Sequence, residues 1–363
     1  MGKIISIATE VPQYKHHQAG LLAFMEGAYG ADDKQRRILK YLYEHSGIDN
    51  RYSVIPDFTL SIDEWQFFPK TKDLEPFPNL EHRMKWFMEN ALPLSLRAAE
   101  KCINGIINKE EITHLITVSC TGMSAPGLEL QLMEAMGLSA DTSRTAINFM
   151  GCYAAVHGLK MANDIVAAHP KAHVLVVCTE LCSLHFQKTF SEDTIVAPLL
   201  FGDGSAAVLI SSDLSEREGL RMDSFYSEVL KDAQSSMTWN LSSTGFIMTL
   251  AGDVPDIFRA DIGKMKERAL HKAGCAHNDV RYWCIHPGGK RILDALGNGL
   301  GIDEEDMAAS RSVLRQYGNM SSCTVLFVLQ EMWHGIISDK GEKVFAAAFG
   351  PGLTMESVTM TVA

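Results

Sequence analysis

The chain has 363 residues, of which 46% are hydrophobic and 21% are charged, and its formal net charge is −11. This length favours two domains of similar size, and no apolar run reaches the eighteen residues that a membrane-spanning helix needs. The acidic balance argues against nucleic acid as the main partner, because phosphate binding requires a dense basic face.

The eight cysteines come without a secretory leader pattern at the start of the sequence. This combination predicts a cytoplasmic protein whose thiols stay free. Cys178 and Cys182 are spaced as C-x3-C, but no second ligand pair stands at a matching spacing. We therefore expect no metal site.

The first 107 residues predict a strand, two helical regions and one irregular excursion. Residues 3–12 alternate as a half-buried strand does, residues 17–46 are expected to be helical, residues 61–83 form a Pro-rich aromatic loop, and residues 84–107 form a helix. From residue 112 onward, short apolar strands alternate with helices, which favours a sheet covered on both faces. The expected order is a strand at 112–120, helices at 128–138 and 151–169, and strands at 172–181 and 205–213.

The second half of the chain repeats this plan. An apolar strand at 281–289, a helix at 319–335 and a strand at 342–352 follow one another in the same order. Cys152 follows Cys120 by 32 residues, and Asn319 follows His286 by 33. We interpret the match as an internal duplication of one α/β unit. The predicted halves are residues 1–212 and 213–363, with their boundary in the polar stretch 211–219.

Cys120, Cys152, His286 and Asn319 all stand at equivalent ends of elements in the two halves. A pseudo-twofold relation between the halves would bring those ends together. The duplication therefore predicts one site built from both halves.

Cys152 opens the helix in the stretch "GCYAAVHGLKMA". Unpaired backbone N–H groups and the positive end of the helix dipole favour thiolate over thiol at such a position. The alternative is a small buried core cysteine. The glycines and alanines around it allow close backbone approach, and they favour a sharply positioned nucleophile.

His286 and Asn319 are the candidate partners of that nucleophile. His286 is the only one of the thirteen histidines that ends an apolar strand, and it leads straight into "PGGK". His16 and four other histidines stand in polar stretches that we expect to be exposed. Asn319 follows a glycine at a helix start, so it could simply be an N-cap. Its position as the counterpart of Cys152 in the duplication favours a role in the site.

Five stretches together carry a resemblance: "GCYAAVHGLKMA", "FGDGSAAVLI", "IHPGGKRILDAL", "YGNMSS" and "AAFGPGLTMESV". Their order and spacing resemble those of the type III polyketide synthases, the chalcone synthase-like enzymes of the thiolase superfamily, and the chain is identified as a bacterial-type member. The resemblance implies a layered αβαβα thiolase fold of two duplicated halves. It also implies a homodimer that needs no acyl carrier protein, no cofactor and no membrane.

The same resemblance implies an acyltransferase of secondary metabolite biosynthesis with acyl-CoA and malonyl-CoA as substrates. Cys152 matches the nucleophile, paired as a thiolate with an imidazolium at His286, and Asn319 matches the catalytic asparagine. A starter held on Cys152 would be extended by decarboxylative Claisen condensation. Donors from His286 and Asn319 would stabilise the enolate. The expected product is a pyrone, resorcinol or phloroglucinol-type ring.

Further residues follow from the resemblance. Phe201 matches the aromatic gatekeeper between the CoA tunnel and the cavity, and Met248 stands where plant members have a second gatekeeper phenylalanine. Ala125 stands where plant members place a methionine in the partner's cavity. These small or flexible walls suggest room for a long acyl starter. The remaining substrate-binding positions are Cys120, Cys182, His185 and Ser321, and the expected CoA-binding cations are Arg51, Lys290 and Arg291.

Two alternatives remain open from the sequence. A ketoacyl-acyl carrier protein synthase of the third kind shares the Cys, His and Asn, but the residues around them favour the polyketide synthases. A thiolase-fold scaffold without catalysis would not need all three polar residues. The glycines of "FGDGSAA" mimic a dinucleotide fingerprint, yet the residues after them form a β-type run instead of the helix that fingerprint requires.

Overall fold

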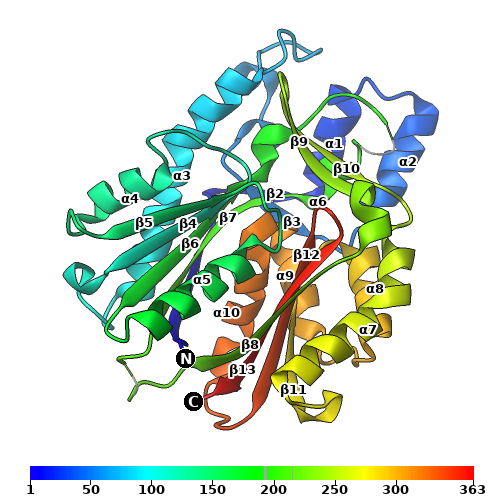
Figure 1. Ribbon diagram of the computed structural model, residues 1–363. Coiled ribbons are helices and arrows are strands. Elements are labelled where there is room, and N and C mark those ends of the chain that lie inside the picture. The colour runs from blue at the N-terminus through cyan, green and yellow to red at the C-terminus, as the bar shows by residue number, and fades with distance from the viewer. Residues whose placement is uncertain (192–193, 215) are drawn as a thin grey trace.

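The computed structural model describes every residue of the chain except 192, 193 and 215, and for Asp232 it describes the backbone only. Nine strands form the main sheet, in the order β11-β12-β13-β8-β1-β7-β6-β4-β5. Figure 1 shows these strands as two groups with helices between and outside them. The first group holds β1 (Lys3–Glu10), β4 (His114–Ser119), β5 (Ser143–Asn148), β6 (His173–Leu181) and β7 (Asp203–Ser211). The second holds β8 (Leu220–Val229), β11 (Val280–Ile285), β12 (Lys343–Gly350) and β13 (Thr354–Val362).

The two groups have the same topology. In the first, β1 pairs antiparallel with β7, β7 antiparallel with β6, and β6 parallel with β4. In the second, β8 pairs antiparallel with β13, β13 antiparallel with β12, and β12 parallel with β11. The groups meet at β1 and β8 through only two residue pairs, Lys3 with Arg221 and Ile4 with Leu220. The strand order thus repeats the plan that the sequence spacing indicated.

The central strands β6, β7 and β13 are buried on both faces, so successive side chains enter different cores. Val174 and Val176 of β6 face the central core, whereas Leu175 and Val177 face an outer one. The central core is formed around α5 (Ala154–Ala168) and α10 (Thr324–Ile336), which contact strands of both groups. Outside lie α3 (Leu80–Ile103) and α4 (Leu128–Met136) on one face, and α7 (Val254–Ala273) and α8 (Lys290–Leu300) on the other. Five layers result.

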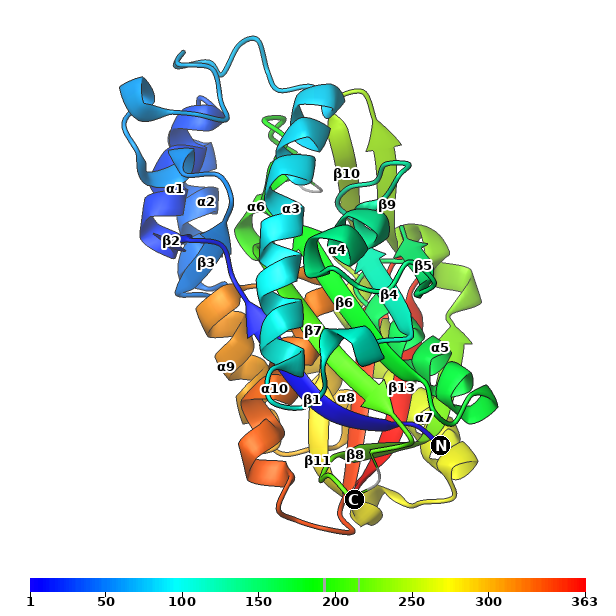
Figure 2. The ribbon, with the colours of Figure 1, turned by 90° about the vertical axis from the view of Figure 1, so that its left-hand side faces the viewer.

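The amino-terminal segment covers the top of the molecule beside α9 (Ala308–Tyr317) (Figure 2). Residues 17–46, expected to be one helical region, form two helices, α1 (Gln18–Ala28) and α2 (Asp33–Glu44). The break has a physical cause, because Gly30 adopts a left-handed φ of 57° and Asp32 caps α2. Two short strands, β2 (Tyr14–His17) and β3 (Asn50–Ser53), pair antiparallel beside these helices.

Three other details correct or complete the sequence-based expectations. The helix expected at 84–107 begins earlier and ends earlier, as α3. Strand β5 was not expected at all. The boundary stretch 211–219 joins β7 to β8, but residue 215 lies outside the described residues, and the division at 212 stays a prediction. A small hairpin of β9 (Met237–Ser242) and β10 (Gly245–Leu250) and the short helix α6 (Ala197–Leu200) complete the surroundings of the site.

Candidate active site

Cys152 lies in a tight turn directly before α5, with 5% of its surface exposed. Gly151 makes the turn possible: its φ is +88°, and a Cβ there would stand 2.2 Å from Cδ of Pro351. A Cβ on Gly350 would lie 3.1 Å from the backbone nitrogen of Cys152. The glycines of "GCY" and "FGPG" therefore let two backbone segments close over the cysteine.

His286 follows β11, and its backbone N–H donates to Ala347 O of β12 at 2.9 Å. The turn after it is closed by Gly288 N–H, which donates to His286 O at 3.2 Å. The side chain is 1% exposed, and within the described part of the chain neither ring nitrogen has a hydrogen-bond partner. A buried imidazole with both nitrogens free of protein partners is suited to exchange protons with a substrate or with a neighbouring thiol.

Asn319 stands between α9 and α10, and its side-chain amide has a fixed orientation. Oδ1 accepts from the Ser321 backbone N–H at 2.8 Å and from the Thr324 hydroxyl at 3.2 Å. Nδ2 donates to Gly288 O at 3.2 Å. Asn319 therefore supports the start of the helical segment, as an N-cap would, and it still turns its N–H groups toward the turn after His286.

These three residues line one cavity, with the predicted gatekeepers Phe201 and Met248 in its wall. Cys152, His286, Asn319, Phe201 and Met248 surround the same apolar space. An adjoining cavity also contains Cys152 in its lining. The other predicted site residues around it are Cys120, Cys182, Phe201, Met248 and Ser321. The structure thus brings together the residues that sequence reasoning placed at the ends of elements in the two halves.

Burial governs the ionisation of the cysteine and the histidine. It raises the pKa of Cys152 to about 12, opposed by hydrogen bonding to Ser321 and Asn319, and it lowers the pKa of His286 to about 3. Each group alone is therefore uncharged near neutral pH. Proton transfer from Cys152 to His286 would charge both at once, and the attraction between them would oppose the burial. The thiolate–imidazolium pair expected from the sequence stays a prediction.

Glu180 is a buried acid that sequence reasoning missed. It is 0% exposed at the end of β6. Its carboxylate accepts from Cys120 N–H at 2.9 Å, from the Thr121 hydroxyl at 2.8 Å and from the Ser322 hydroxyl at 2.5 Å. Burial raises its pKa to about 7. The sequence could have indicated this residue, because an acid inside an otherwise apolar strand is buried and needs hydrogen-bond partners.

His185 is hydrogen-bonded through both ring nitrogens, and it also lines a cavity, so its substrate-binding role stays a prediction. Its Nδ1 accepts from the Phe246 backbone N–H at 3.1 Å, so Nε2 carries the proton and donates to Thr121 O at 2.7 Å. Trp239, from the same hairpin as Phe246, donates from Nε1 to Cys120 O at 2.7 Å. Together these bonds dock the β9–β10 hairpin on the end of β4. Trp239 also lines two of the cavities, and the sequence analysis did not identify it as a site residue.

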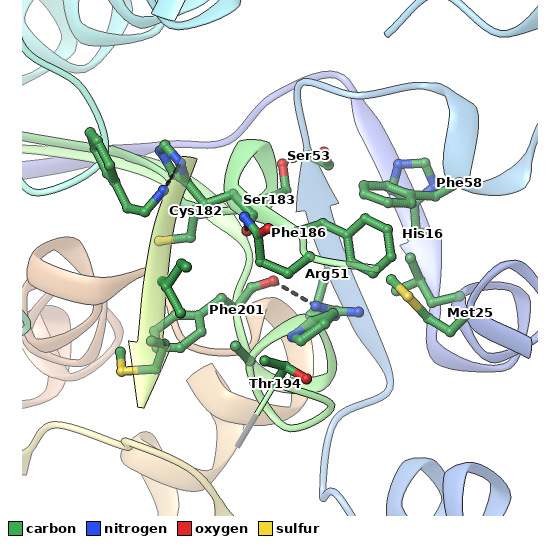
Figure 3. A pocket seen from close by; sticks show the side chains of 18 of the residues that line it. His16, Met25, Arg51, Ser53, Phe58, Cys182, Ser183, Phe186, Thr194 and Phe201 are labelled. Atoms are coloured by element: carbon green, nitrogen blue, oxygen red, sulfur yellow. Dashed lines mark hydrogen bonds between the residues drawn. The ribbon is translucent and has the colours of Figure 1, made fainter. Parts of the chain in front are cut away.

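A third and larger cavity continues past Phe201 and Met248 toward α1 (Figure 3). Leu21 and Met25 of α1, with Phe58 and Phe186, form its far wall. Whereas Nη2 of Arg51 is buried without a partner among the described residues, most of the polar side chains in the lining are hydrogen-bonded within the protein. Among them is His16, which is 2% exposed and bonded through both ring nitrogens to Thr59 and Ile55 O. The expectation that His16 is exposed was wrong, because pairing of β2 with β3 places it inside.

The three predicted CoA-binding cations differ in their surroundings. Lys290 and Arg291 are exposed on the first turn of α8, just after the turn that follows His286, and Lys290 pairs with Asp294 at 2.7 Å. Arg51 is 5% exposed and donates from Nη1 to the backbone oxygen of Phe201 at 2.6 Å, the bond drawn in Figure 3. Arg51 is therefore in contact with the backbone of Phe201, away from the surface.

Ala125 and its neighbours form an exposed loop between β4 and α4. The eight cysteines are free thiols. Among the described residues, no group of three or more His, Cys, Asp or Glu side chains is arranged to hold a metal ion. Within the same residues, no helix is both long enough and apolar enough to cross a membrane.

The chain that carries this site is similar to known proteins over nearly its whole length. The family model for "Chalcone and stilbene synthases, N-terminal domain" matches residues 2–214, and the corresponding C-terminal domain model matches residues 221–363. The chain is 31% identical over 339 residues to the alpha-pyrone synthesis polyketide synthase-like Pks18 of Mycobacterium tuberculosis, covering 91% of this chain and 84% of that protein. It is 28% identical to a putative chalcone synthase of Bacillus subtilis, covering 98% and 97%.

Solved structures agree with these matches. PKS-I from the brown alga Ectocarpus siliculosus superposes with a TM-score of 0.93 at 31% identity, covering 100% of this chain and 98% of that one. The 1,3,6,8-tetrahydroxynaphthalene synthase of Streptomyces coelicolor, a bacterial type III polyketide synthase, superposes with a TM-score of 0.87 at 26% identity, covering 99% of each chain. The layered α/β fold predicted from the sequence is confirmed.

Proposed function

The chain belongs to the chalcone and stilbene synthase family of type III polyketide synthases, which are acyltransferases, and we propose that Cys152, His286 and Asn319 carry its reaction. The observation that supports this most directly is their meeting in one buried cavity although they come from three distant parts of the sequence. The family matches decide between the two enzyme alternatives in favour of the polyketide synthase.

Starter loading requires a nucleophile and a base. The Cys152 thiol gives its proton to the free ring nitrogen of His286, and the sulfur attacks the thioester carbonyl of an acyl-CoA. The tetrahedral intermediate collapses with cleavage of the bond to the CoA sulfur. That sulfur leaves as CoA thiol with the proton from His286. The starter is then a thioester of Cys152.

Extension uses malonyl-CoA. Cleavage of the bond to the terminal carboxylate releases CO2 and leaves the electron pair on the thioester as an enolate. The Asn319 amide N–H and an N–H of His286 donate to the enolate oxygen, and in an apolar cavity such donors are worth far more than in water. The enolate carbon attacks the acyl carbonyl on Cys152, whose sulfur leaves, and the lengthened chain stays on CoA for the next round.

The starter's chemistry follows from the large cavity behind Phe201. Its walls are mainly apolar, and most of its polar side chains are already hydrogen-bonded within the protein. A chain without polar groups loses no hydrogen bond on entering such a space. We propose that an aliphatic acyl chain of the starter lies there, between Phe201 and Met25. Cyclisation to a pyrone, resorcinol or phloroglucinol-type product would follow in the cavities next to Cys152.

CoA thioesters are the family's substrates, without acyl carrier protein. Exposed Lys290 and Arg291 offer charge for the CoA phosphates at the start of α8, where backbone N–H groups also favour an anion. No cofactor is needed for any step above, and we propose a cytoplasmic enzyme that acts with CoA substrates alone.

We also propose that the protein is a homodimer. Strand β5 lies at the edge of the sheet, and an unpaired edge pairs readily with a second copy. Met161 of α5 and Met123 of the neighbouring loop are among the large exposed apolar side chains. Sedimentation of Met161→Glu should show a monomer, whereas Leu241→Glu, which changes an exposed apolar residue on β9, should leave the dimer intact. A wild-type monomer would overturn the proposal.

The reaction itself is tested with radiolabelled malonyl-CoA and a panel of short, long and aromatic acyl-CoA starters. Wild-type protein should release CO2 and CoA and form products that mass spectrometry identifies. Cys152→Ala should form none, and the matched Cys275→Ala, at a half-buried thiol outside the three cavities, should remain active. Condensation by the Cys152→Ala protein would refute the assignment of the nucleophile.

A further inference from the structure

Phe201 and Asn319 belong to one small backbone unit. Their segments form a parallel bridge in which Asn319 N–H donates to Leu200 O and Gly202 N–H donates to Asn319 O, both at 2.9 Å. The gatekeeper ring and the side-chain amide therefore cannot shift independently. Whatever fixes residues 200–202 also fixes Asn319.

Arg51 lies directly against this bridge. Its Nη1 donates to Phe201 O at 2.6 Å. Its methylene groups occupy the space that two glycines leave open: a Cβ on Gly318 would come within 2.9 Å of Arg51 Cδ, and a Cβ on Gly202 within 3.6 Å of Arg51 Cβ. One side chain thus contacts both strands of the bridge, on the residues next to Phe201 and Asn319.

The same guanidinium is held from the amino-terminal segment. Arg51 Nε donates to Gln18 Oε1 at 3.2 Å, and Gln18 Nε2 donates to Leu199 O at 3.1 Å. The two side chains therefore hold consecutive parts of the segment from Leu199 to Phe201. Buried Asp203, fixed by Val54 N–H and Ser183 N–H at 2.8 Å each, also attracts the guanidinium electrostatically.

We propose that Arg51 is a positioning residue, which holds the Phe201–Asn319 bridge so that the Asn319 amide meets the developing enolate. The inference rests on the proposed role of Asn319. It departs from the expectation that Arg51 binds a CoA phosphate, because a phosphate ligand must reach solvent and this side chain is 5% exposed. Its Nε and Nη1 donate to Gln18 and to the Phe201 backbone, and its Nη2, which has no hydrogen-bond partner among the described residues, is buried as well. The rigid fork of arginine suits two simultaneous bonds of this kind.

The test separates the two roles by removing the phosphates from the substrate. CO2 release is measured with malonyl-CoA and with malonyl-pantetheine, which lacks every CoA phosphate, for Arg51→Gln and Arg51→Lys. Positioning predicts that Arg51→Gln lowers the turnover number about tenfold to a hundredfold, by the same factor with both substrates and with little change in KM. Arg51→Lys, which keeps one donor and the charge, should lose less.

The double variant Lys290→Gln, Arg291→Gln provides the contrast. It should raise KM for malonyl-CoA and leave the kinetics with malonyl-pantetheine as they were. If the Arg51 variants show that same pattern, Arg51 is a phosphate ligand and the inference is overturned. Alkylation of Cys152 by iodoacetamide should proceed at the wild-type rate in the Arg51 variants. A parallel loss of alkylation would show general damage to the cavity and would also overturn the inference.

The variant Asn319→Ala shows whether the positioning role of Arg51 or the proposed function itself has failed. If that variant keeps full CO2 release, the assignment of Asn319 fails and the proposed function fails with it. If Asn319→Ala loses CO2 release while both Arg51 variants keep it, only the positioning role is refuted.

Discussion

The side-chain amide of Asn319 donates to the carbonyl oxygen of Gly288 at 3.2 Å. Gly288 is the second residue after His286, so this bond links the two groups that we propose as donors to the enolate. The other end of the amide is occupied by Ser321 N–H and the Thr324 hydroxyl. The amide can therefore present only its nitrogen to the turn after His286.

We expect Asn319→Asp to abolish most of the decarboxylation while the protein remains folded. The oxygen that accepts from Ser321 and Thr324 is kept, but a second oxygen replaces the donor and faces Gly288 O and the negative charge of the enolate. Loss of such a donor lowers turnover by about a hundredfold or more. CO2 release from malonyl-CoA measures it, and Asn298→Asp, on the exposed side of α8, is the control. Undiminished release would contradict the role of Asn319.

A second prediction concerns the proton shared by Cys152 and His286. Burial keeps each neutral on its own, with the pKa of Cys152 raised to about 12 and that of His286 lowered to about 3. If the thiol proton moves to His286, the imidazole favours the thiolate form of Cys152. Without the imidazole, only the effect of burial remains, and burial favours the neutral thiol. The pH midpoint for inactivation by iodoacetamide should therefore be higher in His286→Ala than in the wild type. Superimposable pH profiles would show that His286 does not take the proton.

The strands that were predicted from the sequence, such as β6 and β12, are apolar along nearly their whole length, and the duplicated halves repeat their spacing. Cys152, His286 and Asn319 could be found for the same reason, since each is a polar residue at an end of an apolar element. The elements and contacts that were not predicted depend on residues that are distant in the sequence. Strand β5 has one buried residue, Ile147, in a pattern that gives no strand signal.

Arg51 and His16 show the same limit more sharply. Both stand in polar stretches that favour exposure, yet pairing of β2 with β3 places them side by side, at 5% and 2% exposed. Each has a backbone oxygen among its partners, Phe201 O for Arg51 and Ile55 O for His16. Backbone acceptors leave no trace in the residue types of a sequence, so the third cavity and the support of the gatekeeper became apparent only in the structure.

A third prediction follows from the buried carboxyl of Glu180. Its pKa is raised from 4.5 to about 7 by burial, so the native state favours the protonated form. The stabilisation that this contributes is fully present below pH 4.5 and is lost as the pH rises through 7, by roughly 3 kcal/mol. Glu180→Gln mimics the protonated acid, because its amide can donate to the Ser322 hydroxyl and accept from Cys120 N–H.

The free energy of unfolding in urea, measured at pH 5 and pH 8, tests this. Wild-type protein should lose stability between the two values, and Glu180→Gln should lose clearly less. Glu110→Gln, at an exposed acid before β4, should retain the wild-type dependence on pH. If Glu180→Gln and the wild type change equally between pH 5 and pH 8, the carboxyl is ionised throughout this range.

The last prediction concerns starter length. Met25 lies on the buried face of α1 in the far wall of the third cavity, and Ala23 lies on the exposed face of the same helix. Met25→Trp adds volume where the tail of a long aliphatic starter would end, so it should lower kcat/KM for dodecanoyl-CoA at least tenfold and leave that for butanoyl-CoA near the wild-type value. Ala23→Trp should change neither. A selective loss requires that the tail passes Phe201 and extends toward α1. An unchanged kcat/KM for dodecanoyl-CoA would mean that the cavity does not hold the acyl chain, and the tail would then have to lie beside Cys120 and Cys182.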